Sequence, residues 1–373
     1  MSWPTVLAGD LMLKRGGSIN PKKHVEETFE LYSIPAHDAG KPEILKGSEI
    51  GSSKSCIQPN DVLLSKIVPH IRRCWVVGNA GEHRLMGSGE WIIFRSEKVF
   101  PQYLKYFLTS DIFHKQFMNT VAGVGGSLVR ARPTEVERIE IPLPPLSEQK
   151  RIAAILDKAD QLRQKRQQAI NLADEFLRSV FLDMFGTDQG WECKTVGESL
   201  DLINGRAFKS TEWVKEGLPI IRIQNLKNSS AEYNYYAGHY DEKHYVAKGD
   251  ILLSWAGQLV SFGVFTWNDE PGLLNQHIFN VKPRIKLDRT YLEFALGSIV
   301  ERAKQNFSGI DMKHITKSEL NKYEIAIPPA DVQEQFALVV KKVRSMSYKV
   351  DASRKCVSEA FIALSQKAFA GEL

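Results

Sequence analysis

The sequence lacks several features that mark particular classes of protein. Its 373 residues contain only 4 cysteines, at Cys56, Cys74, Cys193 and Cys356, and none of them forms a CxxC pair. Scattered cysteines are typical of reduced thiols in a cytoplasmic protein and do not support a structural zinc site. No apolar run reaches the roughly 18 residues that span a bilayer, and no basic stretch followed by an apolar one opens the chain. We therefore expect a cytoplasmic protein without a metal site or a membrane segment.

Familiar catalytic motifs are also missing. There is no GxxxxGK[ST] loop for ATP, no GxGxxG after a strand and no GxSxG elbow. The Asn/Asp-Pro-Pro-aromatic tetrapeptide with which an amino-methyltransferase holds its target amine is absent as well. Paired carboxylates such as Glu26 with Glu27 lie in polar stretches that are typical of a solvated surface. We therefore predict a protein that is not an enzyme, with no catalytic residues and no cofactor in this chain.

The charge balance permits a nucleic-acid partner without demanding one. The net charge is +5, from 49 Lys and Arg against 44 Asp and Glu, and the chain has no polybasic tail. A surface that binds DNA would therefore require folding to gather dispersed basic residues onto one face.

The strongest positive feature is an internal repeat with an offset of 184 residues. Ile141-Pro-Leu-Pro-Pro145 and Ile325-Ala-Ile-Pro-Pro329 each precede a long helical pattern. Ten identical pairs keep this register without a gap: Glu140/Glu324, Ile141/Ile325, Pro144/Pro328, Pro145/Pro329, Gln149/Gln333, Ala153/Ala337, Lys158/Lys342, Lys165/Lys349, Glu175/Glu359 and Phe185/Phe369. A register kept over about 45 residues predicts a pseudo-twofold molecule built from two copies of one unit.

The segments after the proline pairs are predicted to be long helices. Ser147 and Asp331 are good N-caps, and the prolines before them prevent the helices from extending backwards. Apolar residues then alternate at spacings of three and four, which predicts a coiled-coil seam. The predicted seam comprises Ile152, Ile155, Ala159, Leu162, Arg166, Ala169, Ala173, Phe176, Val180 and Asp183, and then Phe336, Val339, Val343, Met346, Val350, Ser353, Val357, Ala360, Leu364 and Lys367. Each helix would be roughly 55 Å long, and we expect the two to pair antiparallel; ordinary amphipathic core helices are the alternative.

The repeat divides the chain into four parts, residues 1–146, 147–185, 186–330 and 331–373. The first and third parts contain short apolar runs bounded by turn residues, which predict mixed α/β domains. The matched strand candidates are 62–65, 91–94 and 139–141 in the first part, and 251–254, 277–281 and 323–325 in the third. The expected fold class is therefore α+β, with two mixed α/β domains joined by two long antiparallel coiled-coil helices.

The first helical segment carries a family likeness. Ile141-Pro-Leu-Pro-Pro-Leu-Ser-Glu-Gln-Lys-Arg-Ile-Ala-Ala-Ile-Leu-Asp157 resembles the conserved segment after each target-recognition domain in the DNA-specificity (S) subunit of type I restriction–modification systems. The motif recurs in weaker form as Pro328-Pro-Ala-Asp-Val-Gln-Glu-Gln-Phe336, where valine replaces its glutamate and phenylalanine its isoleucine. The architecture extends the resemblance over the whole chain, while the motif is confined to the two helical regions.

This resemblance implies a non-catalytic subunit that reads a bipartite site in double-stranded DNA, with one target-recognition domain for each half-site. It also implies two methyltransferase (modification) subunits docked on the helices. S-adenosylmethionine and ATP would then belong to partner subunits, since ATP-driven restriction or translocase subunits can join such assemblies. A methyltransferase or nuclease fused to a recognition domain and a protein-only coiled-coil scaffold are the alternatives.

Site residues are predicted from the side chains that read bases from loops, chiefly Arg, Lys, Asn, Gln and Ser. The candidates are Lys66, His70, Arg72, Arg73, Ser127, Arg130 and Arg132 in the first domain, and Arg222, Gln224, Asn225, Lys227, Trp255, Gln258, Lys313 and His314 in the second. An ordinary surface position is the alternative for each, and a core role is the alternative for Trp255. The candidates for binding the methyltransferase subunits, which could instead cap their own helices, are Gln149, Arg151, Gln333 and Gln335.

Overall fold

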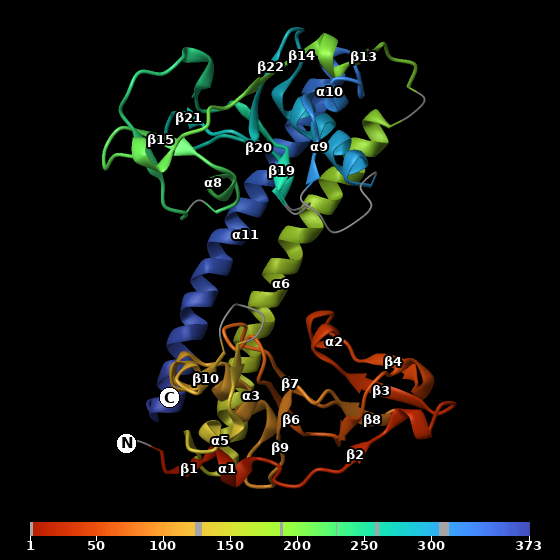
Figure 1. The fold of residues 1–373 in the computed structure, drawn as a ribbon, viewed down its shortest axis with the longest axis vertical. Helices are drawn as coiled ribbons and strands as arrows, with labels where there is room; N and C mark the ends of the chain where they lie inside the picture. The colour runs from red at the N-terminus through yellow and green to blue at the C-terminus, as the bar shows by residue number, and fades with distance from the viewer. Residues whose placement is uncertain (1–2, 124–128, 187–188, 229, 258–260, 306–312) are drawn as a thin grey trace. The chain divides into compact units, whose positions relative to one another are not determined.

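The computed structural model describes residues 3–123, 129–186, 189–228, 230–257, 261–305 and 313–373. The chain divides into two compact units (Figure 1). Unit 1 comprises residues 1–168 and 351–373, and unit 2 comprises residues 169–350. In the described part of the chain, no helix is both long enough and apolar enough to cross a membrane.

Unit 1 is built around two sheets. The larger sheet contains, in spatial order, β2 (Ser18–Ile19), β5 (Lys54–Cys56), β8 (Arg84–Gly87), β3 (Thr28–Tyr32) and β4 (Glu43–Lys46). The smaller sheet contains β7 (Cys74–Val76), β6 (Val62–Ser65) and β9 (Trp91–Phe94). All four residues of β6 are buried, as expected for a central strand that is covered on both faces.

Helices and two small strand pairs complete unit 1. β1 (Thr5–Leu7) pairs with β12 (Glu140–Pro142), and β10 (Val121–Ala122) pairs with β11 (Arg130–Ala131). The helices are α1 (Ala8–Leu11), α2 (Ile34–Asp38), α3 (Pro101–Thr109), α4 (Asp111–Met118) and α5 (Pro133–Val136), with short 3₁₀ turns η1 (Pro21–Lys23) and η2 (Gly47–Glu49). The aromatic rings of Tyr103 and Phe107 from α3 and of Phe113 from α4 fill the core beside the smaller sheet.

Unit 2 repeats this plan. One sheet contains β16 (Asn234–Tyr236), β15 (Leu218–Ile221), β21 (Gly272–Leu274) and β17 (Tyr245–Val246), and the other contains β14 (Leu200–Asn204), β22 (Ile278–Pro283), β18 (Ile251–Ser254) and β20 (Gly263–Thr266). β13 (Cys193–Thr195) pairs with β24 (Glu324–Ala326), and β19 (Ala256–Gly257) pairs with β23 (Lys313–His314). The helices are α7 (Val196–Ser199), α8 (Ile223–Lys227), α9 (Arg289–Gln305) and α10 (Lys317–Leu320), with turns η3 (Ser210–Glu212) and η4 (Glu242–His244).

The strand pairings of the two units correspond. The buried strand β6 lies between β7 and β9, and the buried strand β18 lies between β20 and β22. Each unit also has one parallel pair, β3 with β8 and β15 with β21. The strands predicted at 62–65, 91–94 and 251–254 have the predicted bounds, and the mixed α/β content is confirmed in both units.

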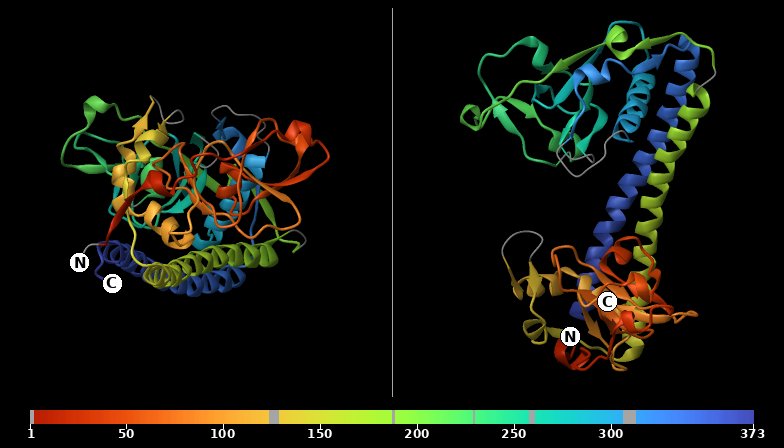
Figure 2. Two further views of the ribbon diagram at one scale, coloured as in Figure 1. Left: turned by 90° about the horizontal axis from the view of Figure 1, so that it is seen from below. Right: turned by 45° about the vertical axis from the view of Figure 1, so that its right-hand side comes forward.

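Two long helices contribute to both units. They are α6 (Leu146–Phe185) and α11 (Ala330–Ala370). In unit 1, Ile152 near the start of α6 and Phe369 near the end of α11 lie in the same hydrophobic core. In unit 2 the ring of Phe181, near the end of α6, lies 5.5 Å from that of Phe336, near the start of α11. The contacts inside each unit therefore bring the start of one helix to the end of the other, and Figure 2 shows the two helices side by side.

The seam predicted for these helices is wrong at several positions. Leu162, Phe176 and Met346 are 45%, 52% and 61% exposed. Residues at a 4-3 alternation are less exposed over much of each helix: 166, 170, 173, 177, 180 and 184 in α6, and 336, 340, 343, 347, 350, 354, 357, 361 and 364 in α11. The predicted positions Ile155, Val339 and Ser353 are also less exposed. The prediction chose the 3-4 alternation, which shares half of these positions, because polar residues such as Ser347 and Arg354 occupy the others.

Arg163 shows how a polar residue serves the helix pair in unit 1. Its guanidinium carbon lies 5.1 Å from the centre of the Phe361 ring, so its planar charge stacks on an aromatic face. Arg163 also pairs with Asp160 one turn earlier, at 2.6 Å. The apolar stem can pack while the head stays in water, which makes such a position hard to recognise in a sequence.

A buried glutamine joins each long helix to the domain before it. The Gln149 side chain accepts from the backbone N–H of Phe100 at 2.7 Å and donates to the carbonyls of Lys98 and Pro144 at 3.1 and 2.8 Å. In unit 2 the Gln333 side chain accepts from the N–H of Asp288 at 2.7 Å and donates to Pro328 at 2.8 Å.

We predict that Gln149→Ala lowers the free energy of unfolding by about 2–3 kcal/mol, because it leaves buried backbone groups without a partner. Hydrogen exchange should accelerate at the Phe100 amide, whose N–H donates a hydrogen bond to Gln149. The matched control is Gln168→Ala on the exposed surface of the same helix, with an expected change below about 0.5 kcal/mol in chemical denaturation. Equal losses in the two variants would contradict this role for Gln149.

Candidate nucleic-acid interface

Two loops of unit 1 are joined by backbone hydrogen bonds into one exposed surface. The first is residues 66–73 between β6 and β7, and the second leads into β11. The Ala131 N–H donates to the Lys66 carbonyl at 2.8 Å, and the Val68 N–H donates to the Val129 carbonyl at 3.1 Å. The predicted candidates of the two loops, far apart in the sequence, are therefore neighbours.

Basic side chains gather on this surface. His70, Arg72, Arg130 and Arg132 are all exposed. Desolvation and the positive charges of Arg72 and His70 lower the pKa of His114 on α4. Exposed basic side chains grouped in this way suit phosphate groups.

Several of these basic groups have intramolecular partners. Arg72 pairs with Asp111 and donates to the carbonyl of Thr109 at 3.2 Å. Arg130 lies 3.3 Å from Glu90, and Lys66 donates to the carbonyl of Gly89. These partners orient the side chains and leave them at the surface, so they remain candidates for DNA contact.

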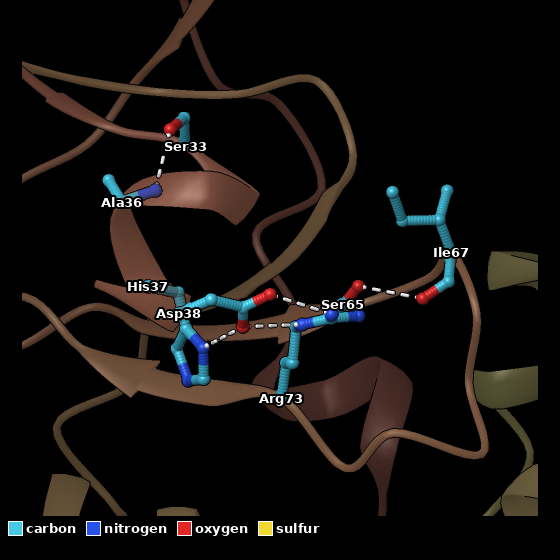
Figure 3. Close-up of polar contacts among 7 residues, drawn as sticks. All are labelled: Ser33, Ala36, His37, Asp38, Ser65, Ile67 and Arg73. Atoms are coloured by element: carbon cyan, nitrogen blue, oxygen red, sulfur yellow. Dashed lines mark hydrogen bonds and ion pairs between the residues drawn. The ribbon is translucent and has the colours of Figure 1, made fainter. Parts of the chain in front are cut away.

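Arg73 differs from its neighbours and corrects the prediction. Its side chain is only 12% exposed, and Nε and Nη2 donate to the two carboxylate oxygens of Asp38 at 2.7 Å each (Figure 3). The guanidinium, with a smaller contribution from His37, lowers the pKa of Asp38 to about 2. Because its donors are directed into the molecule, Arg73 serves as an anchor of the loop and is a poor candidate for base reading.

In unit 2 the predicted cluster at 222–227 separates into buried and exposed members. Asn225 is 3% exposed, and its amide donates to the carbonyls of Ala231 and Glu232 at 3.3 Å. It also accepts from the backbone N–H of Arg222 at 3.0 Å. The prediction for Asn225 is therefore wrong, since its side chain holds the turn that starts α8.

Gln224 and Lys227 are the exposed members of this cluster. Desolvation and the charge of Lys304 on α9 lower the pKa of Lys227. Lys304, which sequence reasoning missed, thus brings a second cation near the end of α8. No signal in the sequence pairs the two lysines, because 77 positions separate 227 from 304.

Trp255 packs against the core, which was the alternative to DNA contact that the sequence left open. Its ring stacks on Phe279 with centroids 5.3 Å apart and meets His277 edge-on at 5.4 Å. Trp255 lies directly between β18 and β19, and β19 pairs with β23. The predicted residues Ser127 and Gln258 lie outside the described residues, as do the side chains of Lys313 and His314.

A cluster of arginines and aromatic rings at the sheet of β16, β15, β21 and β17 in unit 2 was not predicted. The guanidinium carbon of Arg206 lies 4.8 Å from the ring centres of both Phe208 and Tyr236. Arg222 lies 5.6 Å from the Trp213 ring centre and donates to Asn234 at 3.1 Å. The dense aromatic run at 233–236 in an otherwise polar stretch was the available signal.

The residues predicted to bind partner subunits also separate into two kinds. Gln149 and Gln333 are 1% and 4% exposed and use their amides inside the chain, so the prediction of partner contact is wrong for both. Arg151 pairs with Glu148 and donates to the carbonyl of Leu373 at 2.8 Å. Gln335 is exposed on the second turn of α11 and remains a candidate.

The metal-ligating and thiol side chains of the described residues are dispersed. Among residues 3–123, 129–186, 189–228, 230–257, 261–305 and 313–373, no group of three or more His, Cys, Asp or Glu side chains is placed to hold a metal ion. The four cysteines are free thiols, and burial raises the pKa of Cys74 to about 12, which keeps it protonated.

We predict that Arg130→Gln with Arg132→Gln weakens binding to any duplex. Loss of two phosphate contacts should reduce the slope of log K against log salt by about 2. The matched control is Arg138→Gln on a separate exposed turn, where the side chain is 76% exposed. Fluorescence anisotropy at several salt concentrations measures the slope, and an equal reduction in the control would place the interface elsewhere.

The chain matches one family model in two blocks. Residues 6–172 and 188–348 fit the model of the type I restriction modification DNA specificity domain. Each block contains one α/β domain and the first part of the long helix that follows it.

Individual relatives agree with this match. The chain is 27% identical over 183 residues to the Type I restriction enzyme EcoBI specificity subunit of Escherichia coli, covering 48% of this chain and 37% of that protein. It is 28% identical over 251 residues to the Type I restriction enzyme MjaVIII specificity subunit of Methanocaldococcus jannaschii, covering 59% and 58%. The matched region thus spans less than two thirds of either relative.

A solved structure agrees at the level of the fold. It comes from work on complex assembly and conformational transition of the type I restriction–modification system, with a TM-score of 0.56 and 20% identity. The alignment covers 100% of this chain and 98% of that one. Together with the family model, these matches show that the chain belongs to the family of type I restriction–modification DNA specificity subunits.

Proposed function

We propose that this protein is the non-catalytic DNA sequence-specificity subunit of a type I restriction–modification complex in the cytoplasm. The observation that carries the proposal is the match of the family model in two blocks, each with its own exposed loops beside a buried central strand. In unit 1 those loops carry His70, Arg72, Arg130 and Arg132. Their mixture of cations for phosphates and polar groups for base edges is what sequence reading requires.

The duplication favours a bipartite site. In this proposal the domain at 1–146 reads one half-site and the domain at 186–330 reads the other. The corresponding strand pairings of the two units support a pseudo-twofold design. The exposed residues differ between the units, with an arginine pair in one and the Gln224 and Lys227 cluster in the other. Similar scaffolds with different loops would read different sequences.

The long helices are proposed to dock two methyltransferase subunits, which would supply S-adenosylmethionine. Unit 2 supports this with apolar side chains at the helix surface, since Leu182 and Leu338 are 60% and 67% exposed. A groove of about 560 Å³ bounded by α6, α9 and β20 includes Leu182, Phe265 and Phe294. Exposed apolar surface of this kind is typical of protein interfaces. ATP-driven restriction subunits would join through the same assembly.

The helices are also proposed to form an antiparallel coiled coil that sets the distance between half-sites. The 3.5-residue recurrence of less exposed positions in both helices supports this role. A helix of 40 residues is about 60 Å long. Because paired helices bend little, the permitted gap in the DNA should be fixed.

The proposed function is tested by selection of bound duplexes from a random pool, with and without a co-expressed methyltransferase subunit. We expect one bipartite sequence with a fixed gap to be enriched in the presence of that subunit. Methyl transfer to DNA by this chain alone would support the fused-enzyme alternative instead. Enrichment of no sequence in either arm would favour a protein-only scaffold and contradict the proposal.

A spacing variant tests the role of the helices. Seven residues inserted near the middle of both α6 and α11 keep the seam in phase and lengthen each helix by about 10 Å. The selected gap should then grow by about three base pairs, at 3.4 Å per pair. The control is a seven-residue insertion in the exposed turn at 79–82, for which the gap should stay the same. An unchanged gap in the helix variant would show that the helices do not set it.

A further inference from the structure

The loop at 66–73 has the features of a built reading element. Val68 has a φ of +46°, a left-handed conformation that is costly for a β-branched residue. Ile71 is 44% exposed between His70 and Arg72. An apolar side chain held at the surface among cations can meet the methyl group of a thymine while its neighbours meet phosphates.

The ends of this loop are closed on each other. The Ser65 N–H donates to the Arg73 carbonyl at 3.0 Å, and the Ser65 hydroxyl donates to the Ile67 carbonyl at 3.0 Å (Figure 3). The Arg73 N–H in turn donates to the carbonyl of Ile71 at 2.6 Å. The position of Arg73 therefore determines where the exposed residue Ile71 lies.

Asp38 reaches Arg73 from the other sheet of unit 1. It is the last residue of α2, which follows β3 of the five-stranded sheet. The Ser33 hydroxyl caps this short helix by accepting from the Ala36 N–H at 3.0 Å (Figure 3). The two bonds of 2.7 Å from Arg73 fix both the distance and the plane of the guanidinium.

His37 also contacts this carboxylate, at the oxygen that accepts from Arg73 Nε. Its Nδ1 lies 3.1 Å from Asp38 Oδ1, and its ring packs against Trp75 and Trp91 with centroids 5.6 and 6.0 Å away. Trp91 is 5% exposed and donates to the Tyr32 carbonyl at 2.7 Å. The His37 ring that contacts the Asp38 carboxylate is thus held against two tryptophan rings.

The exposure of Asp38 decides between a stabilising role and an orienting one. Its side chain is 47% exposed, and ion pairs this exposed contribute little to stability. A carboxylate in the last turn of a helix also opposes the helix dipole. The Asp38 carboxylate is therefore unfavourable for α2 and well placed to bind the Arg73 guanidinium.

We propose that Asp38 is a positioning residue for sequence reading: through Arg73 it holds the 66–73 loop in the conformation that presents Ile71. This proposal rests on the proposed function, because it assumes that unit 1 reads one half-site. It assigns a role in specificity to a residue that lies outside the loop.

The test uses the full chain assembled with its methyltransferase subunits and the sequence selected by the wild-type complex. Competition with duplexes altered in one half-site at a time gives the discrimination at each half-site. For Asp38→Asn and Arg73→Lys we expect discrimination to fall about tenfold at one half-site and to stay unchanged at the other. Affinity for a random duplex and the melting temperature should stay the same.

Two further variants make the result specific. Asp38→Glu keeps the charge and should retain discrimination within about twofold. Glu27→Gln removes the exposed pair with Arg84 on the same sheet, at 3.4 Å, and should change neither half-site.

The outcomes separate this proposal from the proposed function. A wild-type complex that selects no sequence contradicts the proposed function itself. A selective wild type with unchanged discrimination in Asp38→Asn overturns only the positioning role. Equal loss at both half-sites, or loss of folding in Asp38→Asn and Arg73→Lys, would show that the pair is merely structural and would also overturn it.

Discussion

The attachment of each long helix to the domain before it depends on the hydrogen bonds of one buried glutamine. Gln149 and Gln333 each join a helix to the domain before it through hydrogen bonds to buried backbone groups. Such groups are costly to leave unpaired, so the junction has little freedom. A subunit that reads two sites at a fixed distance needs rigid junctions of this kind. Gln149 and Gln333, which were predicted to bind partners, thus hold the frame together instead.

Much of the frame was predictable because its signals are local. Proline pairs place the starts of α6 and α11 within two residues, although the predicted N-caps Ser147 and Asp331 lie inside the helices. Short apolar runs place β6 and β18. The seam was harder to predict, since a 3-4 and a 4-3 alternation share half their positions. Ser347 and Arg354 occupy two of the others, and a sequence does not show which polar residues will lie at the seam.

The candidate interface was predictable only in part, because its geometry depends on contacts between distant residues. The loop with His70 and the loop with Arg132 were both identified from their residue types. Arg73 looked the same as Arg72 in the sequence, and only its pairing with Asp38, 35 positions away, distinguishes an anchor from an exposed cation. Asn225 was misjudged for the same reason. The frame is thus predictable from local sequence patterns, while the candidate interface depends on tertiary contacts between distant residues.

In the proposed function, a constant frame presents two independent reading surfaces to DNA. The decisive measurement is the mapping of methylated adenines in the source genome, with the gene intact and with it deleted. We expect one bipartite motif, two short half-sites with a fixed gap, whose methylation disappears on deletion. A lost motif that is contiguous, or methylation that is unchanged by deletion, would contradict it.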